Sequence, residues 1–277
     1  MFTCFGSGQC SGDGGFVEFS ARREVELAGG SLQATATQGT AGSVLIDPEN
    51  ITVSADLLRS SGGNASGGGI SWDAGSLTLQ ADERVSVADG VVISTRQVAG
   101  GTRNDHISGN SVGNSGDLTL KAAHIELGNG SMLLAHGNNG HQGGDVSLIA
   151  SDINAIGAVR SADASITATN ATITGRDVTL RANADTSAIV ALLEQTPNIT
   201  LADAQSYINS ELDDTSDGPG GEYLAVKTDA TATTTLRGTR VQATGNVSIE
   251  ALAGARAGVE KDASAPRTIT HHHAAHG

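Results

Sequence analysis

The chain of 277 residues carries a formal net charge of −14, holds 37 glycines and is only 3% aromatic, although 38% of its residues are apolar. Nucleic-acid binding is disfavoured because no basic stripe is present to displace counterions from phosphates, and the acidic balance also opposes binding to anionic membranes. The apolar fraction is too high for a disordered chain. We therefore expect thin, regular layers of small and medium aliphatic side chains.

The first thirteen residues, 1–13, form a glycine-rich stretch that we expect to be disordered or frayed. Its two cysteines, Cys4 and Cys10, are the only ones in the chain. Their spacing allows either a small disulfide loop or two free thiols. The stretch lacks the charged and apolar regions of a secretory signal. The sequence contains no run of about eighteen apolar residues, which a transmembrane helix would need, so we expect no membrane insertion.

A short motif recurs between residues 14 and 253: a glycine, a polar residue, and then apolar, polar, apolar, polar and alanine. The alternation is typical of a half-buried β-strand, since Leu118 and Leu120 of one copy face one side and Thr119 faces the other. One copy is imperfect because Leu45 occupies an outward position. The copies are GFVEFSA (Gly15–Ala21), GSVLID (Gly42–Asp47), GSLTLQA (Gly75–Ala81), GDLTLKA (Gly116–Ala122), GDVSLIA (Gly144–Ala150), GRDVTLRA (Gly175–Ala182) and GNVSIEA (Gly245–Ala251).

Second and third apolar runs follow several copies of the motif, as HIELGNG and SMLLAHG follow GDLTLKA. Three short strands in roughly thirty residues predict one rung of a three-faced parallel β-helix, an all-β solenoid. Each strand would pair with its equivalents in the neighbouring rungs, and the stacked rungs would share one narrow core. Glycine and asparagine would supply positive φ at the corners. The predicted β-helix covers residues 14–253.

Three interruptions break the repeat. Ser60–Gly69 and Val98–Gly116 are polar and glycine-rich, and we expect them to be turns enlarged into loops. Thr186–Asp214 carries helical periodicity in two pieces, which predicts a small helical insertion at 186–214. The His-rich residues 254–277 are expected to be a disordered tail. Because neither end has a polar capping element, we expect the chain to be an internal piece of a longer protein.

The segment Gly14–Val53, GGFVEFSARREVELAGGSLQATATQGTAGSVLIDPENITV, resembles the shaft of filamentous-haemagglutinin-like large exoproteins, the adhesins of two-partner secretion. In that family a GG-x-V-x-x-S-A run leads to an L-x-D-P-x-x-I-x-V segment, and GGFVEFSA and VLIDPENITV match it in order and spacing. The resemblance extends over roughly Gly14–Ala253 as a match of repeats. It contains no motif that carries chemistry.

The resemblance implies a right-handed parallel β-helix that is secreted, or held on the outer cell surface, by a Gram-negative bacterium. The implied function is that of an adhesin shaft that extends and displays loops, with a surface receptor or glycan on a host or neighbouring cell as partner. The implied outer-membrane transporter would recognise an N-terminal secretion region, which we expect to be missing here. The stalk of a contact-dependent toxin is an alternative within the same class.

No residue set stands out as a catalytic, cofactor or metal site. The histidines His271, His272, His273 and His276 are attributed to the composition of the expected disordered tail and not to a metal site. His124, His136 and His141 are expected on turns and surfaces and not around a zinc ion. A β-helical polysaccharide lyase or hydrolase is the alternative from another class, and it needs clustered carboxylates. The best cluster in the sequence is Arg103, Asp105 and His106, for which a solvated turn is the simpler interpretation. We predict no enzyme activity and no cofactor.

Overall fold

The computed structural model describes residues 3–5, 9–11, 14–34, 42–59, 69–154, 159–187 and 227–256. The chain divides into two compact units, the first made of residues 1–153, 162–185 and 230–254 and the second of residues 154–161, 186–229 and 255–277. The first unit contains nearly all of the described residues. Of the second unit, only the end residues of five strands are described.

The described part of the chain is all-β apart from one short helix, α1 (Arg103–Ser108). One sheet has seven strands, in the order β19 (Arg240–Ala243), β16 (Thr172–Gly175), β13 (Met132–Leu134), β10 (Val92–Ser94), β6 (Leu57–Arg59), β7 (Ile70–Asp73) and β4 (Gly30–Gln33). Its pairs with a recorded register are all parallel.

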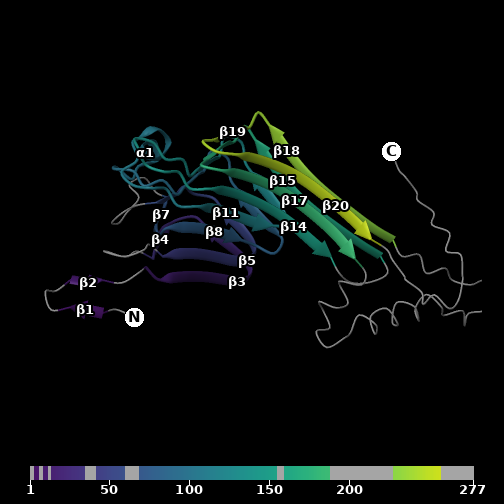
Figure 1. Cartoon of the computed structure of the whole chain (residues 1–277). Helices are drawn as coiled ribbons and strands as arrows, with labels where there is room; N and C mark the ends of the chain where they lie inside the picture. The colour runs from purple at the N-terminus through teal and green to yellow at the C-terminus, as the bar shows by residue number, and fades with distance from the viewer. Residues whose placement is uncertain are drawn as a thin grey trace, which may run out of the picture. The chain divides into compact units, whose positions relative to one another are not determined.

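The second sheet has eleven strands, and β14, β15, β17, β18 and β20 are drawn as its long arrows in Figure 1. Their order is β18 (Lys227–Arg237), β15 (Val159–Thr169), β12 (His124–Leu127), β9 (Arg84–Val87), β5 (Ser43–Val53), β8 (Ser76–Gln80), β11 (Leu118–Ala122), β14 (Val146–Asn154), β17 (Val178–Ser187) and β20 (Val247–Arg256), with β3 (Phe16–Leu27) paired to β5. Strand β5 belongs to both arms of this sheet, because residues 43–46 pair with β8 and residues 50–53 pair with β9.

The copies of the sequence motif pair with one another in register, as the repeat predicts. Leu118 lies opposite Leu77 on one side and opposite Val146 on the other. The second and third runs behave in the same way, since Ile125 pairs with Val85 and with Ile166. The motif copies and the runs that follow them thus pair with their equivalents in neighbouring copies, whereas β6 and β7, which both lie between two successive copies, pair with each other.

The interior consists of columns of aliphatic side chains that run across the strands. Two of these columns are at most 1% exposed at every residue. The first column consists of Val44, Leu77, Leu118, Val146 and Val178, and the second consists of Ile46, Leu79, Leu120, Leu148 and Leu180. Leu45 is only partly buried between Val44 and Ile46, in agreement with its predicted outward position. Burial of this kind contributes roughly 2 kcal/mol per large aliphatic side chain.

Close contact between neighbouring backbones explains why glycine opens the motif at Gly116 and Gly144. A Cβ on Gly116 would lie 1.4 Å from the carbonyl oxygen of Gly75, and one on Gly144 would lie 1.9 Å from that of Gly116. These glycines are needed because neighbouring backbones touch, whereas positive φ occurs at other corners, for example at Gly130 with φ 72°. The prediction that corner glycines and asparagines have positive φ is confirmed, for example at Gly130, Asn139 and Asn170, and the close contact at Gly116 and Gly144 is an additional finding.

The aspartate that follows the glycine in several copies has a backbone role. The Asp117 carboxylate accepts the Asp145 N–H at 2.9 Å, the Asp145 carboxylate accepts the Asp177 N–H at 3.2 Å, and Asp177 accepts the Asn246 N–H at 2.6 Å. Arg176 donates to both oxygens of Asp145, at 2.8 and 2.5 Å. Each strand entry is thus tied to the next along this polar ladder.

One predicted segment has a structure that differs from the prediction, and others lie outside the residues that the structure describes. Within 1–13, β1 (Thr3–Phe5) and β2 (Gln9–Ser11) pair antiparallel with Cys4 opposite Cys10, while the state of the two thiols is outside the described side chains. The helical insertion lies outside the described residues except for 186–187, which belong to β17, and the tail does so except for 254–256, which belong to β20. Among the described residues, no helix is long and apolar enough to span a membrane.

Candidate functional site

The predicted loop Val98–Gly116 contains α1, a helix that was not anticipated from the sequence. Thr102 is the N-cap and forms a capping box with Asp105, whose carboxylate accepts bonds from the Thr102 N–H at 2.9 Å and hydroxyl at 2.5 Å. These bonds from Thr102 lower the pKa of Asp105 below its ordinary value. Such reciprocal bonds satisfy donors that a helix end otherwise leaves free.

An apolar contact seats this loop on the seven-stranded sheet. Ile107 of α1 packs against a small cluster that is separate from the main core. Leu58, Val92 and Leu134 of β6, β10 and β13 form the buried part of that cluster, and Met132 lies at its margin. The loop therefore covers part of the sheet surface that faces away from the main core.

Arg96 lies at the centre of the contacts between loop and sheet and is fully buried. Its guanidinium donates to three backbone carbonyls, those of His136 at 3.2 Å, Gly109 at 2.7 Å and His106. In the described part of the chain no carboxylate forms an ion pair with Arg96. Burial lowers the pKa of Arg96. Because a buried cation is costly unless its donors are satisfied, the carbonyls hold Arg96 and Arg96 in turn orders the loop.

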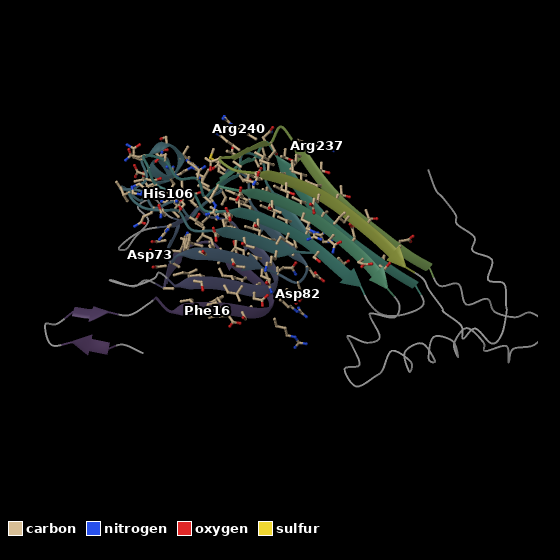
Figure 2. The ribbon with its side chains drawn as sticks, in the orientation of Figure 1. Phe16, Asp73, Asp82, His106, Arg237 and Arg240 are labelled. Carbon is tan, nitrogen blue, oxygen red and sulfur yellow. The ribbon has the colours of Figure 1, made fainter. Side chains whose placement is uncertain are left out.

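His106 is also fully buried, on the face of α1 that meets the sheet (Figure 2). Its Nδ1 lies 2.8 Å from the Ser94 hydroxyl, and no partner among the described residues meets hydrogen-bond geometry with its buried Nε2. Burial, followed by the positive charge of Arg96, lowers the pKa of His106 to about 4, although Asp105 opposes this effect. The ring is therefore neutral at pH 7.

His136 also contacts Arg96. Its Nδ1 is 2.8 Å from the Thr174 hydroxyl, and its backbone carbonyl accepts a bond from Arg96. Burial and Arg96 lower the pKa of His136 to about 4. Two neutral imidazoles thus flank one buried cation. The sequence pattern, which placed His136 on a turn or surface, gave no sign of this arrangement.

The trio Arg103, Asp105 and His106 does not converge into a catalytic group. Arg103 forms an ion pair of 2.5 Å with Asp56 and donates to the Gly90 carbonyl, Asp105 caps the helix, and His106 faces Ser94. Acid–base catalysis needs two titratable groups within reach of one reacting atom. Here each side chain has a different structural partner, so the trio fastens the loop to the sheet.

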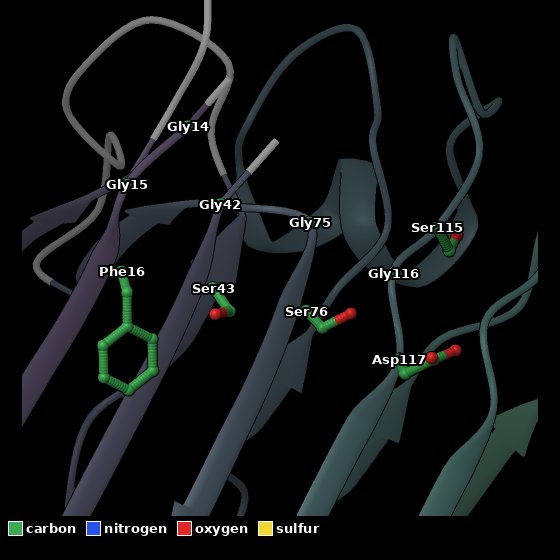
Figure 3. A pocket seen from close by; sticks show the side chains of 10 residues that line it. All are labelled: Gly14, Gly15, Phe16, Gly42, Ser43, Gly75, Ser76, Ser115, Gly116 and Asp117. Atoms are coloured by element: carbon green, nitrogen blue, oxygen red, sulfur yellow. The ribbon is translucent and has the colours of Figure 1, made fainter. Parts of the chain in front are cut away.

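A groove of about 480 Å³ follows the starts of β3, β5, β8 and β11 (Figure 3). Its lining is mostly glycine and serine, and it includes the exposed ring of Phe16 and one carboxylate, that of Asp117. Phe16, Ser43 and Ser76 stand in a row on successive strands. The groove can accommodate a neutral chain by contact and hydrogen bonding, and its described lining holds one carboxylate where a glycosidase uses two.

The predicted histidines do not gather at one point. The Nδ1 of His124 on β12 lies 2.9 Å from the Ser165 hydroxyl of β15, and His141 lies in a separate turn. Among the described residues, no group of three or more possible metal ligands lies close enough together to hold an ion. The four tail histidines are outside the described residues.

Arg96, Ser94 and Thr174 were not singled out from the sequence. The only local signal was the polar run Ser94–Gln97 directly after the apolar run Val91–Ile93, and this pattern is equally typical of an ordinary turn. Their role depends on the return of Val98–Gly116 over the sheet, which no local pattern encodes.

Comparison of the chain with protein-family models, with curated proteins and with solved structures finds no significant match. The class that the structure defines is an all-β protein of stacked parallel strands with an ordered loop fastened over one sheet.

Proposed function

We propose that residues 14–253 form a three-faced parallel β-helix and that the chain is a shaft segment of a secreted bacterial surface adhesin. The observation that carries the proposal is the register of successive motif copies. Strands β8, β9 and β10 pair one by one with β11, β12 and β13, each in parallel. A repeat of three strands whose members each meet their equivalents is the pattern of a solenoid rung. The right-handed sense follows from the resemblance to two-partner-secretion adhesins.

The interior supports a structural function. Aliphatic columns, touching backbones at Gly116 and Gly144, and the aspartate ladder that begins at Asp117 all repeat along the stack. Such features give length and rigidity without a reaction centre. The described titratable side chains with strongly lowered pKa values, His106 and His136, both serve to seat a loop.

The fastened loop supports display. Asn104, Asn110 and Val112 are exposed on it, while Arg96 and His106 fix it from beneath. An ordered loop loses less conformational entropy on binding than a free one. We propose that this loop contacts a receptor or glycan on a host or neighbouring cell, outside the producing Gram-negative bacterium. Delivery would use an outer-membrane transporter that recognises a secretion region separate from residues 14–253.

Adhesion is tested by coating beads with the protein and counting the beads retained on epithelial cells and on neighbouring bacterial cells. The loop variant Asn104→Ala/Asn110→Ala/Val112→Asp should reduce retention at least about fivefold, the usual effect of losing an interface hot spot. The matched control Lys121→Ala/Ser151→Ala/Thr167→Ala changes exposed side chains on strands and should retain the wild-type value. Retention equal to that of uncoated beads, or equal loss in both variants, would overturn the adhesin proposal.

The β-helix is tested separately by proximity labelling within one molecule. Cysteines at Thr78 and Thr119, which are opposed on β8 and β11, should react together with a short bismaleimide in a Cys4→Ser/Cys10→Ser background. The pair Ser86 and Glu126, opposed on β9 and β12, should behave likewise. A mismatched pair made from Thr78 and Glu126 should not. Crosslinking of the mismatched pair in place of the matched ones would refute the stacking of rungs.

A further inference from the structure

Apolar side chains are exposed at two free strand edges. Among the described residues, six large hydrophobic side chains are exposed, and all but Val112 lie on β3 or β20: Phe16, Phe19, Val247, Ile249 and Leu252. In the described strand pairing, β3 pairs only with β5 and β20 pairs only with β17, while the Thr234 hydroxyl of β18 donates to the Glu250 carbonyl of β20 at 3.5 Å. An open parallel edge with apolar side chains is a template for pairing with another strand.

Three of these residues, Phe19, Val247 and Ile249, occupy core positions that lack a cover. Phe19 lies opposite Ile46, which is 0% exposed, yet Phe19 itself is 53% exposed. On the other strand the Val178 N–H donates to the Asn246 carbonyl, which places Val247 beside Val178. Val178 is 1% exposed and Val247 is 48% exposed. Each edge therefore ends an aliphatic column that an additional strand would complete.

We propose that a second copy of this chain covers β20 with its own β3, so that copies stack head to tail. The two free edges terminate opposite ends of one parallel series, so a second copy placed by translation presents the required edge without inversion. The other free strands match in the same way, with β18 and β19 at one end and β3 and β4 at the other. The proposal concerns assembly and does not depend on adhesion.

Side-chain chemistry favours one register. When Val17 lies opposite Val247, Phe19 meets Ile249 and Ala21 meets Ala251 on the core side. On the outward side Glu18 then lies beside Ser248, and Ser20 lies beside Glu250. A shift of two residues toward the C-terminus of β20 would instead place Glu18 against Glu250, and like charges directly opposed on neighbouring strands are destabilising.

The interface is heterologous, because one surface of each copy meets a different surface of the next. Such contacts do not close on themselves and produce chains of copies. The net charge of −14 on each copy opposes the contact at long range. Salt screens this repulsion, with a Debye length of about 10 Å at 0.1 M and about 3 Å at 1 M. Association should therefore strengthen as salt is added.

Sedimentation velocity of the full chain over a range of concentrations, at low and high salt, tests the association. Ile249→Asp should weaken it at least about tenfold, because the new carboxylate would be buried without a partner. Val112→Asp is the matched control, since Val112 and Ile249 are both 49% exposed and Val112 lies on the loop. A chain that stays monomeric at every concentration and salt overturns the proposal, and so does an equal effect of both substitutions.

Crosslinking identifies the edges that meet. In a Cys4→Ser/Cys10→Ser background, Ser20→Cys protein is mixed with Glu250→Cys protein and treated with a short bismaleimide. The mixture should give a covalent dimer, and neither protein alone should. Dimers from Glu250→Cys protein alone would indicate pairing of two β20 edges and overturn the proposal. A monomer whose β20 edge amides resist hydrogen exchange would assign the edge to other residues of the same chain, which overturns it as well.

Discussion

Acidification should destabilise the protein through the two histidines that flank Arg96. In the folded chain the pKa of His106 and that of His136 are both lowered from 6.5 to about 4, first by burial and then by Arg96. The unfolded chain therefore binds protons at both sites as the pH falls below about 6.5, while the folded chain does not until about 4. Stability that is present above pH 6.5 is lost as the pH falls toward 4.

The size of the effect follows from the two pKa values. A pKa difference of 6.5 − 4 corresponds to a limiting loss of about 3 kcal/mol for each histidine. Between pH 7.5 and pH 5 the same linkage gives about 2 kcal/mol for the fully buried His106. The value for His136 is smaller, because that residue is partly exposed. Burial raises the pKa of Asp73, which acts in the opposite sense and offsets a part of the loss at the acidic end.

The chain carries its own reporter for this measurement. Trp72 is the single tryptophan, is fully buried, and donates from Nε1 to the Ser94 carbonyl at 3.2 Å, and the Ser94 hydroxyl contacts His106. Urea unfolding followed by tryptophan fluorescence at several pH values between 5 and 7.5 gives the free energy of unfolding directly. His106→Asn, whose amide retains a partner for Ser94, should flatten the pH dependence by about 2 kcal/mol.

His124→Asn is the control, because His124 lies on β12 away from Arg96 and its replacement should leave the slope unchanged. The reasoning fails if the wild-type free energy of unfolding is the same at pH 5 and pH 7.5. It also fails if His106→Asn retains the full slope while it folds with wild-type fluorescence.

Three further substitutions test the stack and the loop by urea unfolding at pH 7.5. Gly116→Ala should destabilise by more than about 3 kcal/mol, because its Cβ would lie 1.4 Å from the Gly75 carbonyl, whereas Gly15→Ala should be neutral since nothing lies within 4 Å of its Cβ. Leu120→Ala should cost about 2–5 kcal/mol from a fully buried column, and a loss below about 1 kcal/mol would contradict the packed core. Arg96→Met should leave three carbonyls unpaired and make the Val98–Gly116 loop the first site of proteolysis, and unchanged protease resistance would show that Arg96 does not hold it.

The strands and their register could be predicted because the information is local and repeated. The alternation Leu118, Thr119, Leu120 predicts a strand with one buried face, and equivalent residues in other copies are its neighbours in space. Because a slip by one residue would turn the aliphatic side chains outward, the pattern also fixes the register. The close backbone contact at the motif glycine was not predicted, because such contact leaves the same sequence signal as a turn glycine.

The loop could not be predicted in the same way. Thr102 and Asp105 form a capping box, and that pattern was present in the sequence, but a six-residue helix among glycines gives too short a period to detect. Arg96 becomes buried only because two separate segments meet it, α1 with its C-cap, which supplies His106 and Gly109, and the turn after β13, which supplies His136. Such a site is defined by tertiary contacts alone. Arg103, Asp105 and His106 do not form a catalytic cluster for the same reason, because closeness in sequence did not determine where each side chain points.

The exposed apolar side chains of the loop differ in their surroundings from those of the edge strands β3 and β20, and this difference separates receptor contact from assembly. An apolar side chain on the loop, Val112, is exposed beside polar neighbours, whereas Phe19 and Ile249 are exposed in rows that continue buried columns. A receptor contact would draw on the first kind of surface and assembly on the second. The variants Val112→Asp and Ile249→Asp should therefore separate cell retention from self-association, each affecting one and sparing the other. Loss of both in either variant would show that a single surface serves both, and the division of roles between loop and edges would then be wrong.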